Sequence, residues 1–302
     1  MPADSDNPDA VAAPSAVRFA GPGAAGLLRG HLPELNDPGS AGWTRVKRNA
    51  SRTVYRGRVG SAEVYVKQFH PRAVGHRIRR RLGAGGAMRE FRCGQWLAER
   101  GVATAEPLAA RCANGDEWVA TLAVTPADPA DAWHERKLAG GRSGRREVQR
   151  AIRRLADMVA RMHEAGLVHR DLHCGNVLVR EASDGPELVL MDLHRVARRR
   201  RLSRRARAKN LAMLMHDRYD LTTRTERLRF LRHYLRVSGA SGTLRGWQLQ
   251  VETFGRRHRA KQYRRRDRRI SGRCEYFSPI RVPGGWRGHV VLASRRAMAG
   301  SQ

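Results

Sequence analysis

Acidic residues are scarce in this chain, and so are lysines among its basic residues. The 302 residues include 28 acidic and 59 basic ones, for a formal net charge of +31, and only five of the basic residues are lysines. A surface so unbalanced repels itself unless an anionic partner covers part of it. Anionic membrane lipids would be such a partner, and the alternative explanation is an arginine-biased composition with solvated helix faces.

Long apolar runs and patterned cysteines are also missing. No run approaches the roughly 18 apolar residues of a membrane-spanning helix, and the N-terminus lacks the basic and apolar regions of a signal peptide. The cysteines follow no disulfide or zinc spacing: Cys93, Cys112, Cys174 and Cys274. We therefore expect a cytoplasmic protein with reduced thiols.

The most specific pattern is the tract 169–179, which begins His-Arg-Asp-Leu and carries an Asn five residues after the Asp. It matches the catalytic-loop pattern H-R-D-L-x-x-x-N of kinases. Asp171 suits the role of accepting the proton of an attacking hydroxyl, and Asn176 suits that of holding Mg²⁺. We expect His169 to brace this loop.

Zinc binding is the alternative role for this tract, through His169, His173 and Cys174. Zinc sites need three or four ligands, and no partner pair occurs at the usual spacing. The kinase interpretation is therefore preferred.

The flanking segments follow the order of a kinase C-terminal lobe. The apolar spacing over 152–162 predicts an amphipathic helix that ends at Gly166, and 177–179 and 188–191 read as two strands. The second strand leads into Asp192, the position of the D-F-G aspartate that binds Mg²⁺. The triplet here is Asp-Leu-His, and a turn residue or helix cap is the alternative role for Asp192.

The N-terminal half predicts three strands, over 43–47, 53–59 and 62–69. The third contains Val-Tyr-Val-Lys, which resembles the V-A-I-K strand whose lysine contacts the α- and β-phosphates of ATP. Lys67 is therefore the candidate phosphate ligand, and a solvated edge charge is its alternative role.

A helix predicted over 87–100 offers Glu90 as the partner of Lys67. Glu99 is the competing candidate in the same helix. Because Arg89 and Arg92 flank Glu90, a surface ion pair is the other alternative.

Two kinase features are missing from the sequence. No G-x-G-x-x-G precedes Lys67, and the loop 48–52 stands in its place, where Asn49, Ser51 and Arg52 are candidate phosphate contacts. No A-P-E follows Asp192 to close a peptide-binding segment. A small or lipid-linked hydroxyl substrate is therefore favoured over a protein.

The order of elements predicts an α+β, two-lobed, protein-kinase-like fold, with a small β-rich N-lobe and a mainly helical C-lobe. We expect a flexible leader over 1–40, the nucleotide-binding N-lobe over 41–125 and the catalytic C-lobe over 126–255. A basic and aromatic segment with a short β-hairpin is expected over 256–302.

The motifs together resemble the lipopolysaccharide kinase family, which comprises Kdo kinases and core heptose kinases. The resemblance covers roughly 43–235 and rests on the Lys67 strand, the helix of Glu90, the catalytic loop, Asp192 and the arginine-rich stretch that runs into Lys-Asn-Leu at 209–211. It implies an alcohol-group phosphotransferase that uses ATP and Mg²⁺ on a sugar hydroxyl of the lipid A–core, at the cytoplasmic face of the inner membrane.

Two alternatives stay open. One keeps the kinase fold and changes the substrate to an antibiotic, another small molecule or a protein. The other is a catalytically weak, basic module that binds nucleic acid or membrane, which the missing glycine loop and the basic tracts at 76–81, 198–209 and 256–269 motivate.

Overall fold

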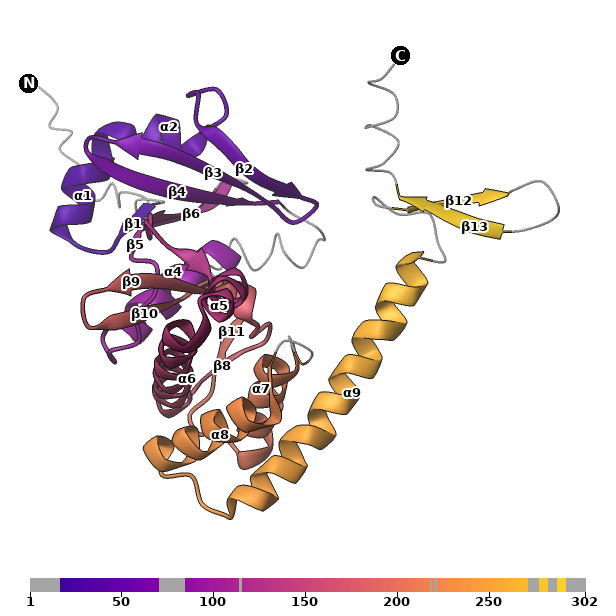
Figure 1. The fold of residues 1–302 in the computed structure, drawn as a ribbon. Coiled ribbons are helices and arrows are strands. Elements are labelled where there is room, and N and C mark those ends of the chain that lie inside the picture. The colour runs from indigo at the N-terminus through magenta and orange to yellow at the C-terminus, as the bar shows by residue number, and fades with distance from the viewer. Residues whose placement is uncertain are drawn as a thin grey trace, which may run out of the picture.

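The computed structural model describes residues 17–70, 85–113, 116–217, 219, 222–270, 277–281 and 287–291. It has a β-rich upper lobe and a mainly helical lower lobe, as predicted (Figure 1). Among the helices of these residues, none combines the length and the apolar composition that crossing a lipid bilayer requires.

The upper lobe is built on a six-stranded sheet in the order β1-β5-β6-β4-β3-β2, with every neighbouring pair antiparallel. Its strands are β1 (Val17–Phe19), β2 (Thr44–Asn49), β3 (Arg52–Val59), β4 (Ala62–Phe69), β5 (Pro107–Ala113) and β6 (Asp116–Leu122). A turn at Gly60 and Ser61 joins β3 to β4, and Gly60 has a φ of 58°, which glycine adopts without a steric penalty. Helix α4 (Gly86–Ala98) packs against β5 and β6 and matches the helix predicted over 87–100.

The expected flexible leader is wrong for residues 17–36. These residues form β1, α1 (Pro22–Leu28), the 3₁₀ turn η1 (Arg29–His31) and α2 (Leu32–Asn36). Leu28 and Leu35 are fully buried with Trp118 of β6, whose Nε1 donates to Oδ1 of Asn36 at 2.8 Å. Helices of seven and five residues are too short to leave a periodic apolar pattern, so tertiary packing holds them in place.

The lower lobe holds the larger hydrophobic core, which surrounds α6. Its helices are α5 (Ala130–Ala139), α6 (Gly141–Glu164), α7 (Arg204–Asp217), α8 (Arg224–Ser238) and α9 (Leu244–Ile270). The predicted helix end at Gly166 is confirmed, with a φ of 76°. Helix α8 begins with a capping box of Thr223 and Glu226 and ends at Gly239, which has a φ of 56°.

Short strands and 3₁₀ turns between the helices carry the catalytic loop. They are β7 (Asp128–Pro129), β8 (Leu167–His169), η2 (Cys174–Asn176), β9 (Val177–Ala182), β10 (Gly185–Leu190), η3 (Leu193–Arg195) and β11 (Val196–Arg198). The predicted hairpin of two strands is β9–β10, with Val177 opposite Leu190. The hairpin thereby brings Asp192, two residues after β10, close to the catalytic loop that precedes β9.

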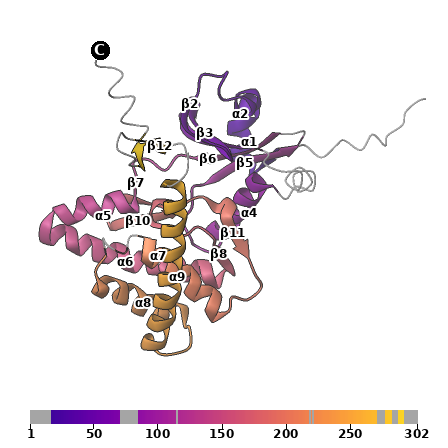
Figure 2. The same ribbon diagram turned by 90° about the vertical axis from the view of Figure 1, so that its right-hand side faces the viewer.

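Helix α9 crosses the boundary that we expected between 255 and 256. It runs as one helix from the base of the lower lobe past α7 and ends below the hairpin of β12 (Phe277–Arg281) and β13 (Arg287–Val291) (Figures 1 and 2). Gly255 lies where a Cβ atom would come within 2.2 Å of Nε2 of His216, so this glycine permits α7 and α9 to approach closely instead of ending the helix. The hairpin confirms the one predicted near the C-terminus, while its expected turn lies outside the described residues.

Part of the basic tract 198–209 is used within the fold. Arg204 lies 5.0 Å from the ring centre of Trp247, and Lys209 lies 5.6 Å from that of Phe254, both rings belonging to α9. These cations join α7 to α9 through cation–π contacts. The basic tract at 76–81 lies outside the described residues.

Candidate active site

Lys67, Glu90 and Asp192 meet at the boundary between the lobes. Nζ of Lys67 lies 2.6 Å from Oε1 of Glu90 and 3.0 Å from Oδ1 of Asp192. The three side chains come from β4, α4 and the segment between β10 and η3, and their exposed fractions are 8%, 6% and 15%. Glu99, the competing partner, is 65% exposed and pairs with Arg100 at the surface.

Mutual attraction keeps this buried cluster ionised. Burial alone would lower the pKa of Lys67, but the carboxylates of Glu90 and Asp192 outweigh it and raise this pKa. Burial alone would raise the pKa values of both carboxyl groups, and the neighbouring Lys67 lowers them instead, with Arg52 adding to the effect at Asp192. A lysine held in this way keeps its charge for a phosphate group.

The catalytic loop is held by its own histidine. Nε2 of His169 donates to the carbonyl of Met191 at 3.0 Å, and its Nδ1 accepts from the backbone N–H of Asp171 at 3.2 Å. Burial lowers the pKa of His169, which fits this neutral form. Since both ring nitrogens are occupied, His169 braces the loop and is unsuited to the alternative zinc site.

Asp171 and Asn176 are held together in this loop. Nδ2 of Asn176 donates to the carbonyl of Asp171 at 2.8 Å, which fixes the distance between the two side chains along the loop. Oδ2 of Asp171 accepts from Nη1 of Arg195 at 2.8 Å, and its carboxylate is 39% exposed. A half-exposed carboxylate of this kind is open to a hydroxyl group that enters the cleft.

A cavity of about 410 Å³ connects the catalytic loop with the turn between β2 and β3. Its lining includes Asp171, Asp192, Arg195 and the three residues predicted to contact phosphate, Asn49, Ser51 and Arg52. Asn49, Ser51 and Arg52 differ from one another in the contacts they make. Oδ1 of Asn49 accepts from the amides of Ser51 and Arg52 and from the Ser51 hydroxyl, at 2.7–3.0 Å, so Asn49 shapes the turn.

Arg52 is the member of this turn that reaches across the cleft. Its Nη2 donates to Oδ2 of Asp192 at 2.6 Å, and its Nη1 lies 3.1 Å from Nε2 of His194. The turn therefore supplies an arginine side chain at the place where kinases with a glycine loop supply backbone amides.

A second cavity, of about 800 Å³, is lined by Lys67, by strands β3, β4 and β6 of the sheet and by β9. Val54, Tyr65, Leu122 and Met191 contribute to its lining. A cavity with a largely apolar lining beside Lys67 suits the flat base of a nucleotide.

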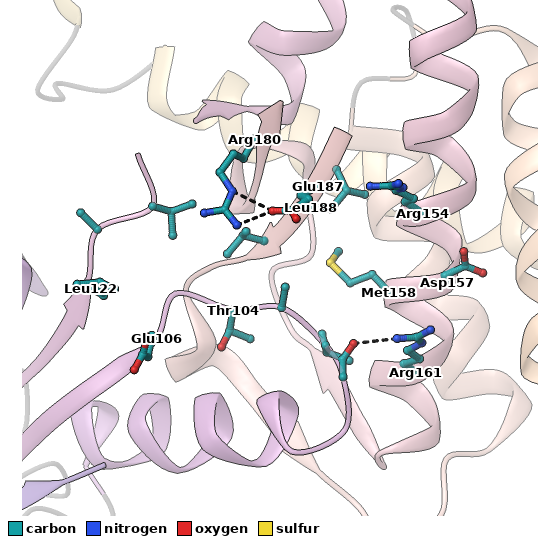
Figure 3. A pocket seen from close by; sticks show the side chains of 16 residues that line it. Thr104, Glu106, Leu122, Arg154, Asp157, Met158, Arg161, Arg180, Glu187 and Leu188 are labelled. Atoms are coloured by element: carbon teal, nitrogen blue, oxygen red, sulfur yellow. Dashed lines mark hydrogen bonds and ion pairs between the residues drawn. The ribbon is translucent and has the colours of Figure 1, made fainter. Parts of the chain in front are cut away.

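A third cavity, of about 710 Å³, is lined by residues of the segments 101–106 and 122–124 and of α6, β9 and β10 (Figure 3). Thr104, Met158 and Leu188 line it, with the ion pair of Arg180 and Glu187 at one side (Figure 3). None of the residues predicted for the site is among its lining residues, and it shares Leu122 and Val124 with the cavity beside Lys67.

The donor atoms at the end of β10 fit a magnesium ion, which prefers carboxylate and amide oxygens. The amide of Met191 donates to the carbonyl of Asn176 at 2.8 Å, so Asp192 follows directly beside Asn176. Because Nδ2 of Asn176 is already used, its Oδ1 is the atom left for a metal. Asp192 has a φ of 61°, a left-handed conformation rare for residues other than glycine and frequent at functional sites.

A second group of possible ligand atoms lies around Glu90, in the buried part of the site. Oxygen or nitrogen atoms of Glu90, Asp192 and His194 lie within 4.8 Å of one another. Lys67 and Arg52 pair with the carboxylates of this group, so it forms a buried ion-pair cluster.

Several positioning residues escaped the sequence analysis. Asn210 of α7 donates to the carbonyl of His169 at 2.6 Å and accepts from its N–H at 3.2 Å, so one amide side chain ties α7 to the catalytic loop. Its Oδ1 also accepts from Nε2 of His163 at 3.1 Å, while Nδ1 of His163 accepts from the hydroxyl of Tyr234. An asparagine directly before the apolar stretch 211–215 was the available signal, because a buried amide needs partners.

Helix α4 is fixed at both ends by residues that the sequence did not single out. Oε1 of Glu117 accepts from the amide of Ala87 at 2.8 Å in the first turn, where negative charge is favourable. Towards the other end, Nε1 of Trp96 donates to the carbonyl of Ala165 at 3.1 Å.

The Trp96 ring lies between two guanidinium groups. Those of Arg100 and Arg198 are 3.2 and 3.6 Å from its centre. Arg198 belongs to β11, so the stack joins α4 to the lower lobe.

Fold and site together define a phosphotransferase of the protein-kinase-like class. The chain belongs to the lipopolysaccharide kinase (Kdo/WaaP) family, whose model matches residues 41–234. This confirms the resemblance seen in the sequence and the kinase activity that it implied.

Two solved structures are similar in fold. The structure described as WaaP in complex with acyl carrier protein has a TM-score of 0.59 and 24% identity, and the match covers 80% of this chain and 98% of that one. An aminoglycoside-3'-phosphotransferase of type VIII has a TM-score of 0.47 and 19% identity, with 70% of this chain and 93% of that chain covered. No curated protein sequence matches the chain significantly.

Proposed function

We propose that this chain transfers the γ-phosphate of ATP, with Mg²⁺, to a hydroxyl group of a Kdo or heptose residue in the lipid A–core of lipopolysaccharide. The observation that carries the proposal is the meeting of Lys67, Glu90 and Asp192 beside a loop that presents Asp171 and Asn176. Family membership supplies the substrate class.

In this mechanism, Asp171 accepts the proton of the sugar hydroxyl as its oxygen bonds to the γ-phosphorus. The bond between the γ-phosphorus and the bridging oxygen then breaks, and ADP leaves. Lys67, oriented by Glu90, binds the α- and β-phosphates. Asn176 and Asp192 would hold the magnesium ion, which supplies charge neutralisation on the phosphates when bound.

Arg52 and Arg195 contribute positive charge on either side of the transferred group. Each pairs with a carboxylate of the site, Arg52 with Asp192 and Arg195 with Asp171. A phosphate group entering the cavity offers both guanidinium groups a stronger partner, because arginine binds phosphate in a bidentate manner.

The acceptor lies on the inner leaflet of the inner membrane in this proposal, so the enzyme works as a peripheral protein at the cytoplasmic face. The exposed basic residues of the chain supply the attraction to anionic lipid headgroups. The related WaaP was solved with an acyl carrier protein, and co-purification from cells would test whether this chain has a similar partner.

The test is phosphate transfer from labelled ATP to purified lipid A–core, with wild type compared with Asp192→Ala and Asp171→Asn. We expect transfer by the wild type alone, and retained ATP binding by Asp171→Asn. Mass spectrometry of the product, or the use of acceptors truncated to Kdo, distinguishes Kdo from heptose. ATP binding without transfer to any lipopolysaccharide acceptor would contradict the proposed substrate.

A further inference from the structure

Helices α6 and α8 pack against each other in the lower lobe, and a cavity of about 350 Å³ lies between them (Figures 1 and 2). Four arginines line this cavity: Arg153 of α6 and Arg229, Arg232 and Arg236 of α8. The three on α8 follow one another at three and four residues, the spacing of one helix face. We call this cavity the α6–α8 groove. It shares no lining residue with the cavities of the candidate active site.

The arginines of the α6–α8 groove lack the acidic partners that other arginines of the surface have. Arg56, Arg154 and Arg180 each pair with a carboxylate. The residues that line the groove include no aspartate or glutamate, and within the described part of the chain no carboxylate forms an ion pair with its four arginines. Like charges gathered around one cavity repel each other, so this arrangement costs free energy unless an anion occupies the groove.

One of the four guanidinium groups is held in position by the protein. Nε2 of His233 donates to Oδ1 of Asp157 at 2.7 Å. Nδ1 of the same ring lies 3.3 Å from Nη2 of Arg236, and it accepts this hydrogen bond because a guanidinium group can only donate. His233 thus occupies the carboxylate beside the groove and fixes Arg236. A side chain fixed in advance loses less conformational entropy when a ligand binds.

The α6–α8 groove also has apolar surface. Ile152 lines it and is partly exposed, and the methylene stems of the arginines lie beneath their charged groups. Phospholipids present the matching chemistry, a phosphate group directly beside glycerol and acyl groups.

The dimensions of the groove favour a lipid over a free phosphate compound. The cavity is small, and all four arginines at its rim are exposed, so a soluble ligand would leave much of its surface in water. A membrane presents many phosphate groups at a high local concentration, which compensates for the weakness of each single contact.

We infer that the α6–α8 groove binds phosphate groups of anionic membrane lipids, so that this face of the lower lobe is where the enzyme contacts the membrane. Arginine suits this role because its planar guanidinium group binds phosphate oxygens in a bidentate manner. The inference rests on the peripheral location given in the proposed function, and it adds the surface that makes the contact. General attraction to a membrane would depend on the number of basic residues and not on their position in a groove.

The chain offers matched variants for this distinction. The groove variant is Arg153→Ala/Arg232→Ala, which removes one arginine from each wall and leaves Arg236 with its histidine. The control variant is Arg245→Ala/Arg256→Ala. These two exposed arginines share one face of α9, since eleven residues correspond to about three helical turns, and neither lines any of the four cavities described. Both variants lose two positive charges.

A third variant, Arg153→Lys/Arg232→Lys, keeps the charge of the groove and removes the planar donors. If the guanidinium groups bind phosphate directly, lysine should restore only part of the binding that alanine removes.

The experiment is sedimentation of the full chain with vesicles of phosphatidylcholine and phosphatidylglycerol, in the absence of ATP and acceptor. We expect the wild type to bind, the groove variant to bind roughly 10- to 100-fold more weakly, and the control variant to stay within about 3-fold of the wild type. Vesicles of phosphatidylcholine alone provide the reference without net charge. Thermal unfolding and ATP binding verify that each variant is folded.

Several outcomes would overturn the inference. Absence of binding by the wild type, or unchanged binding by the groove variant, would remove the proposed contact. Equal losses in the groove and control variants, or full recovery with lysine, would leave only general attraction. A groove variant that keeps vesicle binding but loses binding to inorganic phosphate or to duplex DNA would assign the groove to a soluble phosphate compound or to nucleic acid.

Failure of the proposed function would be seen separately. The vesicles contain no acceptor, so their binding does not depend on the kinase reaction. Absence of phosphate transfer to lipid A–core would contradict the proposed substrate and leave the result of the sedimentation experiment unchanged.

Discussion

Arg52 and Asp192 form an ion pair across the cleft between the lobes, with 2.6 Å between Nη2 and Oδ2. An arginine from a β-turn thus contacts the proposed metal ligand directly. The loop lacks the glycines that bring backbone amides close to phosphate, and this guanidinium group stands in the same place.

We expect Arg52→Ala to raise KM for ATP by roughly 10- to 100-fold, because the phosphates lose a charge-assisted hydrogen bond. Steady-state kinetics at saturating acceptor measure this. Ser51→Ala is the matched control, since the Ser51 hydroxyl is already bonded to Asn49, and its KM for ATP should change by less than about 2-fold. An unchanged KM for ATP in Arg52→Ala would show that this arginine pairs with Asp192 without contacting the nucleotide.

Lys67 and Glu90 should show strong coupling in a double-mutant cycle. Removal of either partner leaves a buried charge uncompensated, which costs about 3–5 kcal/mol of unfolding free energy. The double variant Lys67→Ala/Glu90→Ala should lose less than the sum of the single variants, by about 1–3 kcal/mol. Urea unfolding provides the four values, and additive losses would show that the pair contributes no net attraction.

Asn210→Ala should destabilise the fold and slow the reaction together. The change removes the partner of the buried N–H and C=O groups of His169, at a cost of about 2–4 kcal/mol. Since His169 holds the amide of Asp171, kcat should fall as well. Lys209→Ala, an exposed neighbour, is the control and should stay within about 1 kcal/mol. A normal kcat in Asn210→Ala would separate this asparagine from catalysis.

Stability should decrease in mild acid because of His163. Burial lowers the pKa of this histidine from 6.5 to about 4. Above pH 6.5 the ring is neutral in both the folded and the unfolded state, and the full stability is present. As the pH falls from 6.5 toward 4, the unfolded chain binds a proton that the folded chain does not, and the free energy of unfolding falls by on the order of 3 kcal/mol.

Urea unfolding at pH 7, 6 and 5 measures this decrease for the wild type and for His163→Gln. The variant should show a smaller slope, because glutamine does not titrate. A residual slope is expected from His216, whose pKa is also lowered to about 4 by burial and by nearby arginines. Identical slopes in wild type and variant would exclude His163 as the source.

The sequence predicted those parts of the site that local spacing determines. Asp171, Asn176 and Asp192 lie within 22 consecutive residues, and Lys67 lies in a strand with a recognisable pattern, so short-range geometry was enough. Glu90 required a choice over Glu99, and the buried contact with Lys67 favours Glu90.

Contacts between segments that lie far apart in the chain could not be predicted from the sequence. Arg195 and Asn210 act on residues 24 and 41 positions away, and the sequence does not show which partners their side chains reach. The N-terminal helices were missed because Leu28 and Leu35 are single buried anchors in very short elements. Gly255 was read as an end of the catalytic lobe, whereas it permits close packing inside a long helix.

The several attachments of α4 have a consequence for how activity is controlled. In protein kinases, inward and outward movement of the helix that carries the lysine's glutamate partner is a means of switching. Here that helix is held by Glu117 at its first turn, by Lys67 at Glu90, and by Ala165 and Arg198 at Trp96. An outward swing would break all of these contacts at once, so α4 is poorly suited to act as a moving switch.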